Sequence, residues 1–272
     1  MIGKILSEFH LLMRDLVNIK ILGVEIKSHT FFGYMIGVPI TILLTFIMWK
    51  RWKKEIQILI NFYATFWIGF FLSFPLYLIF LSIIKRKSFP IEIMSVMWLF
   101  ALGVSFLYFF FHHNKEKILD FYDHILSFLA FLLGWVKLFH CFVFGCCFGK
   151  PTELPWGVVF HPESPAGLEY GNTPLHPVQL YNLIGAWIII PPALWLLKRK
   201  HFDGEVVMWM FLYLGVMKTF EFPYFRGDYP AIYRIWIISI PIFLISLFAL
   251  IISYYRFLSK KESISYRPFE GR

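Results

Sequence analysis

Long apolar runs separated by short polar connections dominate the chain. Seven of these runs are close to the roughly 20 residues that an α-helix needs to cross the hydrocarbon of a bilayer. The pattern therefore predicts an all-α polytopic membrane protein with about seven transmembrane helices. The predicted spans are residues 29–49, 57–84, 91–111, 121–148, 178–197, 205–222 and 231–255.

The first 28 residues have a different pattern, in which charged side chains alternate with apolar ones. Ile5, Phe9, Leu12 and Leu16 recur at helical spacing, which predicts a short amphipathic helix lying on the membrane surface. The chain then divides into three parts: an interfacial segment at 1–28, a seven-helix membrane domain at 29–255 with an outer loop at 149–177, and a basic cytoplasmic tail at 256–272.

The composition agrees with a membrane protein and argues against a nucleic-acid partner. Hydrophobic residues make up 58% of the chain and charged residues 16%, whereas soluble domains are near half apolar and a quarter charged. The formal net charge of +9 comes from short Lys and Arg clusters between the apolar runs. That distribution is typical of membrane topology.

The positions of Lys and Arg also predict an orientation, because cytoplasmic loops are enriched in them. With the N-terminus outside, the inner segments hold fourteen of these residues and the outer segments hold nine. The cluster at Lys85, Arg86 and Lys87 goes against the rule. We predict an outer N-terminus, a cytoplasmic C-terminus and an outer location for the polar loop 149–177.

Three cations fall inside predicted spans: Lys137, Lys218 and Arg234. Each would cost a few kcal/mol if it faced lipid. Glu221 lies three residues after Lys218 and so on the same helical face. The two residues form either a structural ion pair or part of a polar cavity for a charged headgroup, while Arg234 is close enough to the interface to snorkel.

Lys137 and His140 are likewise three residues apart, at the outer end of the fourth span. Two cationic or potentially cationic groups on one face suit a phosphate better than they suit lipid tails. The alternative for His140 is an interior residue that is simply hydrogen-bonded.

All three cysteines, Cys141, Cys146 and Cys147, follow His140 directly. Their Cys-x4-Cys-Cys spacing is not a standard zinc pattern, and a fourth ligand would have to be His161 or His176, so no metal site is predicted. A disulfide from Cys141 to Cys146 or Cys147 is an alternative on an outer face. Small buried side chains that let helices pack closely are the favoured interpretation.

Two dense motifs are not explained by the bilayer. Gly145–Phe160 reads GCCFGKPTELPWGVVF, and His176–Tyr181 reads HPVQLY. Both closely resemble the hallmark region of the bacterial prolipoprotein diacylglyceryl transferases. Phe220–Tyr229, which reads FEFPYFRGDY, is similar to that family's Glu-Phe-Phe-Arg stretch with one extra residue. The family fold implied by this resemblance has seven spans, an outer N-terminus and a cytoplasmic C-terminus.

The resemblance implies an enzyme of the bacterial cytoplasmic (inner) membrane. Its reaction would transfer a diacylglyceryl group from phosphatidylglycerol to the lipobox cysteine thiol in the signal peptide of a prolipoprotein, releasing glycerol phosphate and leaving a thioether. The partners are then phosphatidylglycerol, the prolipoprotein and membrane lipid, and no cofactor is expected. The chemistry needs a thiolate nucleophile and stabilisation of the departing phosphate charge.

The residues expected to carry this chemistry come from the same motifs and from the intramembrane polar groups. The expected catalytic residues are His140, Lys137, Glu221 and His176. The residues expected to bind the phospholipid headgroup are Lys218, Arg226, Gly149, Gln179 and Tyr181.

Several positions depart from the family pattern. Leu138 stands where the family has Arg, and Cys141 replaces its Asn. The His-Gly-Gly motif of the third span is missing. Lys218 occupies the position of another family Arg, and Asn182 occupies the position of a family Glu. The alternative function is therefore a catalytically altered or inactive homologue that keeps the lipid-binding fold and acts on another lipid or acceptor. A transporter or a redox or metal protein is a more distant alternative.

Overall fold

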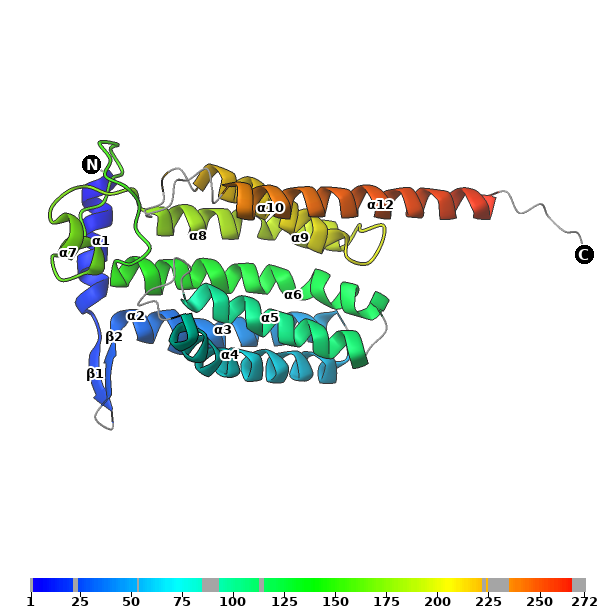
Figure 1. Cartoon of the computed structure of the whole chain (residues 1–272), viewed down its shortest axis with the longest axis horizontal. Helices are drawn as coiled ribbons and strands as arrows, with labels where there is room; N and C mark the ends of the chain where they lie inside the picture. The colour runs from blue at the N-terminus through cyan, green and yellow to red at the C-terminus, as the bar shows by residue number, and fades with distance from the viewer. Residues whose placement is uncertain are drawn as a thin grey trace, which may run out of the picture. The chain divides into compact units, whose positions relative to one another are not determined.

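A computed structural model of the chain describes residues 2–21, 24–52, 54–84, 93–112, 115–221, 224 and 235–265. Arg226, Arg234 and the cluster at Lys85–Lys87 lie outside these residues. All seven predicted spans coincide with helical residues in the described part (Figure 1). The helices are α1 (Ile2–Asp15), α2 (Ser28–Thr30), α3 (Gly37–Arg51), α4 (Ile56–Ile84), α5 (Ile93–His112), α6 (Lys115–Val136), α7 (Pro165–Tyr170), α8 (Val178–Ile188), α9 (Ile190–Leu197), α10 (Glu205–Glu221) and α12 (Ile240–Ser265).

Three wider π-helical turns join some of these helices. The turn Phe31–Ile36 (η1) connects α2 to α3, Lys137–Phe142 (η2) continues α6, and Ile235–Ser239 (η4) leads into α12. Four continuous helical stretches among the described residues are long and apolar enough to cross a membrane: Ser28–Arg51, Ile118–Phe142, Val178–Leu197 and Ile240–Lys260. The chain is therefore a multi-pass helical membrane protein, while the count of seven spans and the orientation stay predictions.

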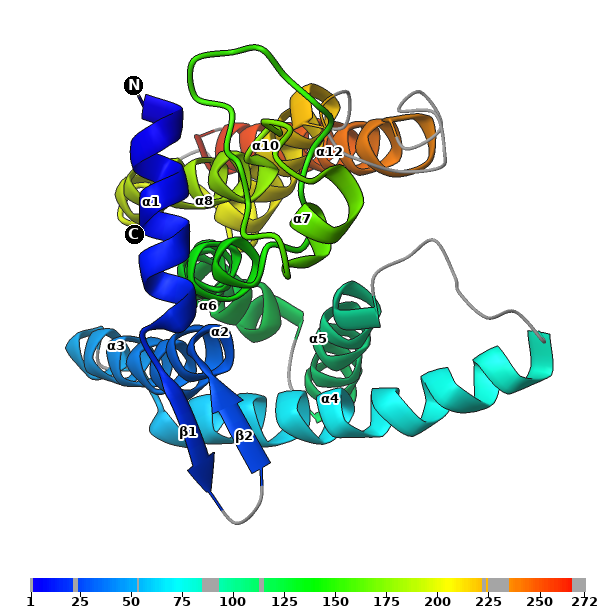
Figure 2. The same cartoon turned by 90° about the vertical axis from the view of Figure 1, so that its left-hand side faces the viewer.

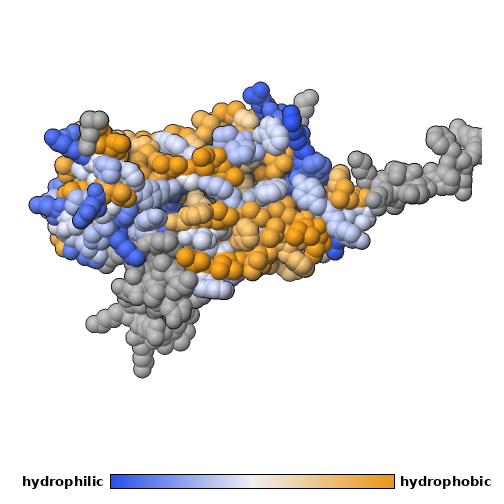
Figure 3. All heavy atoms as spheres, turned by 90° about the horizontal axis from the view of Figure 1, so that it is seen from above, coloured by the Kyte–Doolittle hydropathy of each residue, from blue (hydrophilic) through white to orange (hydrophobic). Residues whose placement is uncertain are grey.

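The side chains on α12 show how such a helix meets its surroundings. Leu244, Ile245, Phe248 and Ile251 are all more than half exposed, with Ile245 at 69%. In Figure 3 hydrophobic residues cover the middle of this face and hydrophilic residues gather toward its ends. An apolar surface of this extent is stable in lipid rather than in water.

The chain folds as two compact units. The smaller unit, 43–122, packs α4 against α5 around an aromatic core. Phe62 is fully buried in it, with ring centroids 5.1 Å from Phe121 and 5.8 Å from Phe66. Lys54 and Asp120 form an ion pair at 2.6 Å at one end of this unit.

The larger unit, 1–42 with 123–272, holds the predicted site residues. Its helices approach closely where glycine faces tryptophan: a Cβ on Gly37 would lie 2.3 Å from the Trp135 ring, and one on Gly134 would lie 2.3 Å from Trp187. The Trp135 Nε1 donates to the Phe32 carbonyl at 2.8 Å. Small residues permit this backbone approach in a membrane, where dispersion and interhelical hydrogen bonds drive association.

At one end of the larger unit, α1 runs across the direction of the long helices rather than along it (Figures 1 and 2). Some of its apolar side chains point away from the protein, since Ile5 is 57% exposed and Leu12 65% exposed, while Leu6 and Phe9 pack against the buried cluster around Phe142. Gly3 and His10 lie buried on a different face. The predicted amphipathic helix is thus present, and its attachment combines these apolar contacts with its small and polar residues.

A short β-hairpin follows α1, formed by β1 (Asn18–Ile21) and β2 (Val24–Lys27), with Ile19 paired to Ile26. The described chain is mostly helical, as predicted, and this hairpin is a local exception that the all-α prediction did not include. Residues 18–21 and 24–27 alternate polar and β-branched apolar side chains, which is a strand pattern. This segment was predicted only as part of the interfacial segment 1–28, without strands.

The loop 149–177 is folded around a small core that it shares with the end of the fourth predicted span. Phe142, Phe148, Val158, Phe160 and Leu175 are buried together, and Leu175 exchanges backbone hydrogen bonds with Val158 at 2.9 Å in both directions. The loop therefore holds its polar residues on a fixed support.

Candidate functional site

The fourth predicted span ends in a tight reversal of the backbone. The Cys141 carbonyl accepts hydrogen bonds from the Gly145 and Cys146 amides, both at 3.0 Å. Gly145 has φ 76° and Cys147 has φ 55°, in the left-handed region that disfavours a side chain. Residues that keep such a conformation are often part of functional sites.

This reversal brings the three cysteine sulfurs together. The Sγ atoms of Cys141, Cys146 and Cys147 all lie within 4.8 Å of one another. Cys141 is buried, and Cys146 and Cys147 are partly buried. The Cys146 carbonyl accepts from Gln179 Nε2 of α8 at 2.5 Å, which ties the cysteine turn to the next predicted span.

Lys137 and His140, on η2, lie beside this turn. Lys137 lies close enough to Tyr34, His140 and Cys147 for its charge to act on each of them. The His140 ring lies 4.7 Å from Tyr34 and 5.2 Å from His29, measured between centroids. The His140 ring therefore faces other side chains of the unit.

A second polar group joins α8 to α10. Lys218 Nζ donates to Asn182 Oδ1 at 2.7 Å and to Glu221 Oε2 at 2.5 Å. Asn182 Nδ2 donates to the other carboxylate oxygen of Glu221 at 2.5 Å. The side chain of Glu221 is 5% exposed and that of Lys218 is 22% exposed, so the expected ion pair is present and largely buried.

Gln179 and Asn182 are three residues apart on one buried face of α8. Polar groups thus follow α8 from the cysteine turn to the Lys218–Glu221 pair. Two buried polar atoms near this path have no hydrogen-bond partner among the described residues: His140 Nδ1 and Gln179 Oε1. Buried polar atoms nearly always have partners, so these two are available to a ligand.

A third group lies at the start of α8. His176 Nδ1 and the Tyr181 hydroxyl form a hydrogen bond at 3.0 Å, and the same hydroxyl accepts from Trp156 Nε1 at 2.9 Å. The Gly149 amide donates to the His176 carbonyl at 2.9 Å. A Cβ on Gly149 would lie 2.6 Å from both the His176 Cβ and the Tyr224 carbonyl oxygen, so only glycine fits.

His176 is buried, and this burial lowers the pKa of its imidazole below the usual 6.5, with a smaller lowering from the charge of Lys150. The imidazole is therefore neutral at pH 7. A neutral imidazole can accept a proton or orient the Tyr181 hydroxyl.

On α8, Gln179 thus contacts the cysteine turn beside Lys137 and His140, and Asn182, three residues further on, contacts Lys218 and Glu221. The structure places Gly149, His176 and Tyr181 together at the loop. Arg226, the remaining predicted residue, lies outside the described residues. None of the predicted site residues lines the two cavities described next.

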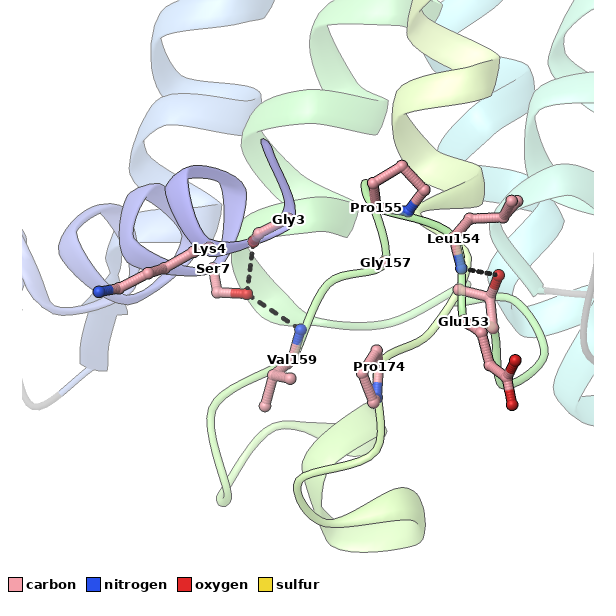
Figure 4. Close-up of a pocket in the computed structure, with 10 residues that line it drawn as sticks. Gly3, Lys4, Ser7, Glu153, Leu154, Pro155, Gly157, Val159 and Pro174 are labelled. Carbon is pink, nitrogen blue, oxygen red and sulfur yellow. Dashed lines mark hydrogen bonds between the residues drawn. The ribbon is translucent and has the colours of Figure 1, made fainter. Parts of the chain in front are cut away.

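One of these cavities, of about 420 Å³, lies between α1 and the loop (Figure 4). Ser7 bridges its two sides, accepting from the Val159 amide at 3.0 Å and donating to the Gly3 carbonyl at 2.9 Å. The other, of about 220 Å³, is an apolar groove between α10 and α12, lined by Val216, Thr219, Phe220, Ser239, Ile240 and Phe243.

Sequence reasoning missed three members of these groups. Tyr34 lies in a span where only apolar residues drew attention, and Asn182 was noticed only as a departure from a family pattern. His10 was overlooked because the helical periodicity emphasised its apolar neighbours. Its Nδ1 donates to the Phe142 carbonyl at 2.9 Å, and its Nε2 accepts from the His161 amide at 3.1 Å.

The fold and the site define a polytopic helical membrane protein with polar groups held at one end of its long helices. A family model described as prolipoprotein diacylglyceryl transferase matches residues 16–252. This match covers most of the chain, which therefore belongs to the prolipoprotein diacylglyceryl transferase family.

Several relatives bear the name phosphatidylglycerol–prolipoprotein diacylglyceryl transferase. The protein of Clostridium tetani is 30% identical over 128 residues, which are 46% of this chain and 49% of the relative. That of Fusobacterium nucleatum is 50% identical over 54 residues, 18% of this chain and 17% of the relative. That of Cupriavidus metallidurans is 41% identical over 71 residues, 26% of this chain and 24% of the relative. The chain thus matches about half of the first relative's length and less of the others.

Proposed function

We propose that the chain transfers a diacylglyceryl group from phosphatidylglycerol to the lipobox cysteine thiol of a prolipoprotein signal peptide, in a bacterial cytoplasmic membrane. The observation that carries this proposal is the buried polar face of α8, where Gln179 contacts the cysteine turn and Asn182 contacts Lys218 and Glu221, in a chain whose residues 16–252 match the family. The seven-span fold with an outer N-terminus belongs to the same proposal. In that orientation these residues would lie toward the outer leaflet, where signal peptides emerge.

The reaction is a substitution at a glycerol carbon. A thiolate attacks the carbon, the bond from that carbon to the phosphate oxygen breaks, and glycerol phosphate leaves. Lys137, Lys218 and Arg226 would stabilise the charge that develops on the departing phosphate. His140, with an unpartnered ring nitrogen among the described residues, would take the thiol proton.

The remaining predicted residues would position the substrates. Glu221 fixes the Lys218 ammonium through their ion pair and stands beside Asn182. His176, neutral at pH 7, and Tyr181 would orient the lipid headgroup or the acceptor peptide, and Gln179 offers its free carbonyl oxygen. Gly149 permits the close approach of the loop to His176.

A second candidate is a homologue that binds lipid but acts on another lipid or acceptor. It is favoured by the pairing of Lys218 with Glu221, which reduces the net positive charge offered to a phosphate, and by Leu138 and Cys141 at family Arg and Asn positions.

One experiment separates the two candidates. Cells depleted of their own transferase would express this chain, and the lipidation of a reporter prolipoprotein would be followed by its mobility shift. We expect lipidation to be restored. Membrane-inserted, well-expressed protein that restores none would reject the first candidate. A Lys137→Met variant is the matched control for residual activity of the host.

A further inference from the structure

The cysteine turn has a feature that neither sequence spacing nor the family pattern predicts. Three thiols that lie six residues apart at most meet within 4.8 Å, and the Cys146 thiol is within hydrogen-bonding reach of both Cys141 and Cys147. The left-handed backbone at Gly145 and Cys147 creates this proximity, because it folds the chain back over Cys141. Close packing of small residues does not require a strained cysteine.

We infer that Cys141, Cys146 and Cys147 bind one zinc ion whose fourth coordination position receives the acceptor thiol of the lipobox peptide. This inference rests on the proposed function and names the way in which that function activates its nucleophile. Sulfur ligands at about 2.3 Å around a tetrahedral zinc lie about 3.8 Å apart, which the observed sulfurs reach through small side-chain rotations.

The number of ligands favours a reactive site over a structural one. Structural zinc sites are closed by four protein ligands, whereas catalytic sites have three and keep one position open. Among the described residues, the group of potential metal ligands at this turn contains these three cysteines and no fourth residue. The open position would suit the proposed reaction, because its acceptor substrate is a thiol that can bind zinc.

The surroundings suit a zinc-bound thiolate. A thiol that binds zinc is deprotonated, and the thiolate is the nucleophile that substitution requires. Lys137 lies near Cys147, so its charge offsets part of the excess negative charge of the zinc–thiolate group. Cys141 is buried, and burial protects the site from bulk water.

The step balances without a redox partner. The lipobox thiol gives its proton to His140 and binds as a thiolate. The sulfur electron pair then forms the bond to the glycerol carbon, the carbon–oxygen bond to the phosphate breaks, and the phosphate leaves as an anion. The thioether is neutral and a weaker ligand than the thiolate, so the product departs and water or a new thiol takes its place.

The test uses the full chain in nanodiscs that contain phosphatidylglycerol. Zinc content is measured by elemental mass spectrometry, and cobalt is then exchanged for zinc so that sulfur-to-cobalt absorption reports the ligands. We expect one zinc per chain, protection of all three thiols from alkylation by bound zinc, and loss of zinc in the Cys141→Ser, Cys146→Ser and Cys147→Ser triple variant. The control His112→Ala removes an exposed imidazole and should keep the metal.

Adding a lipobox peptide tests the fourth position. The cobalt spectrum should change with the cysteine peptide and stay unchanged with a peptide that carries serine instead. Three results would each overturn the inference: folded protein that binds no zinc, a disulfide between these cysteines, or a cobalt spectrum that does not change when the thiol peptide is added. Reporter lipidation that persists in the triple serine variant would overturn it while the proposed function stands. A thiol-responsive site in a chain that restores no lipidation would instead reject the proposed function alone.

Discussion

Asn182 on α8 donates a hydrogen bond of 2.5 Å to Glu221, the last residue of α10, and the same Asn182 accepts from Lys218. The three side chains form a closed polar triangle between two helices. Each side chain forms hydrogen bonds with the other two, and the Lys218 and Glu221 charges compensate each other. The triangle can therefore lie within the membrane region without an uncompensated charge.

The triangle predicts an asymmetric response to substitution. Glu221→Gln leaves the Lys218 ammonium without its counter-ion and should lower the free energy of unfolding by about 3–5 kcal/mol. The double variant Lys218→Met, Glu221→Leu removes both charges and should recover much of that loss. Thermal unfolding in detergent micelles measures both. Lys54→Met breaks the more exposed pair with Asp120 and should cost about 1 kcal/mol or less. Equal destabilisation by the single and double variants would contradict the triangle as a paired unit.

The attachment of α1 to the loop should depend on pH through His10. Burial, with smaller contributions from the nearby charges of Arg14 and His161, lowers the His10 pKa from 6.5 to about 4, against the opposing effects of the Phe142 hydrogen bond and Asp15. The Nε2 atom accepts from the His161 amide, so a proton there would break that bond. The docked state therefore binds fewer protons than the free one. The contribution of neutral His10 to the stability of the docked state is fully present above pH 6.5. This contribution falls by about 3 kcal/mol in all as the pH falls toward 4.

Hydrogen exchange at the Gly3 amide, which donates to the Pro155 carbonyl at 2.9 Å, reports the docking of α1. We expect faster exchange between pH 6.5 and 4 after correction for the intrinsic rate. His10→Gln can keep a donor and an acceptor but does not titrate, so its corrected exchange should be flat over this range. A wild-type protein with equally flat exchange would disprove the role of His10.

Sequence patterns predicted the helices of this fold well, because a bilayer imposes length and apolarity on each crossing segment. The Lys218–Glu221 pair could also be predicted, since three-residue spacing on a helix brings side chains together. The hairpin after α1 was missed because its strands are only four residues long, which is a short stretch for recognising an alternating pattern.

Contacts between helices, turns and loops could not be predicted from the sequence patterns. The meeting of the three sulfurs depends on the φ angles of Gly145 and Cys147, and a Cys-x4-Cys-Cys spacing does not specify them. In the same way, the link from Gln179 to the Cys146 carbonyl joins residues 33 positions apart. Local periodicity carries no information about contacts between residues so far apart in the sequence.

His176 should contribute to catalysis in its neutral form. Its pKa is lowered by burial, so the acidic limb of the pH–rate profile should lie below pH 6.5, with activity lost as the pH falls through the lowered pKa. His176→Ala should reduce the rate by roughly 10²–10⁴-fold if it transfers a proton. Kinetics with a synthetic lipobox peptide in phosphatidylglycerol vesicles measure both effects. Tyr181→Phe removes only the hydrogen-bond partner, and a loss as large as that of His176→Ala would indicate positioning rather than proton transfer.

Lys137 should act through its charge in the transition state. Lys137→Met should lower kcat by about 10²–10³-fold, the loss typical of removing one group that stabilises a developing anion, with little change in KM. Lys137→Arg keeps the charge and should retain part of the activity. Lys4→Met, which removes an exposed charge on α1, is the matched control and should be close to wild type. A Lys137→Met enzyme with normal kcat and a raised KM would show that the charge serves binding alone.

Gly149 should be intolerant of any side chain. Its added Cβ would lie 2.6 Å from both the His176 Cβ and the Tyr224 carbonyl oxygen, and backbone atoms cannot move aside as a flexible side chain would. Gly149→Ala should therefore displace His176 and reduce lipidation of the reporter by the same order as His176→Ala. Gly103→Ala is the control, because a Cβ there meets nothing within 4 Å and should stabilise α5 by roughly 0.5–1 kcal/mol. If Gly149→Ala kept full activity in a folded protein, the loop would not need its present contact with His176.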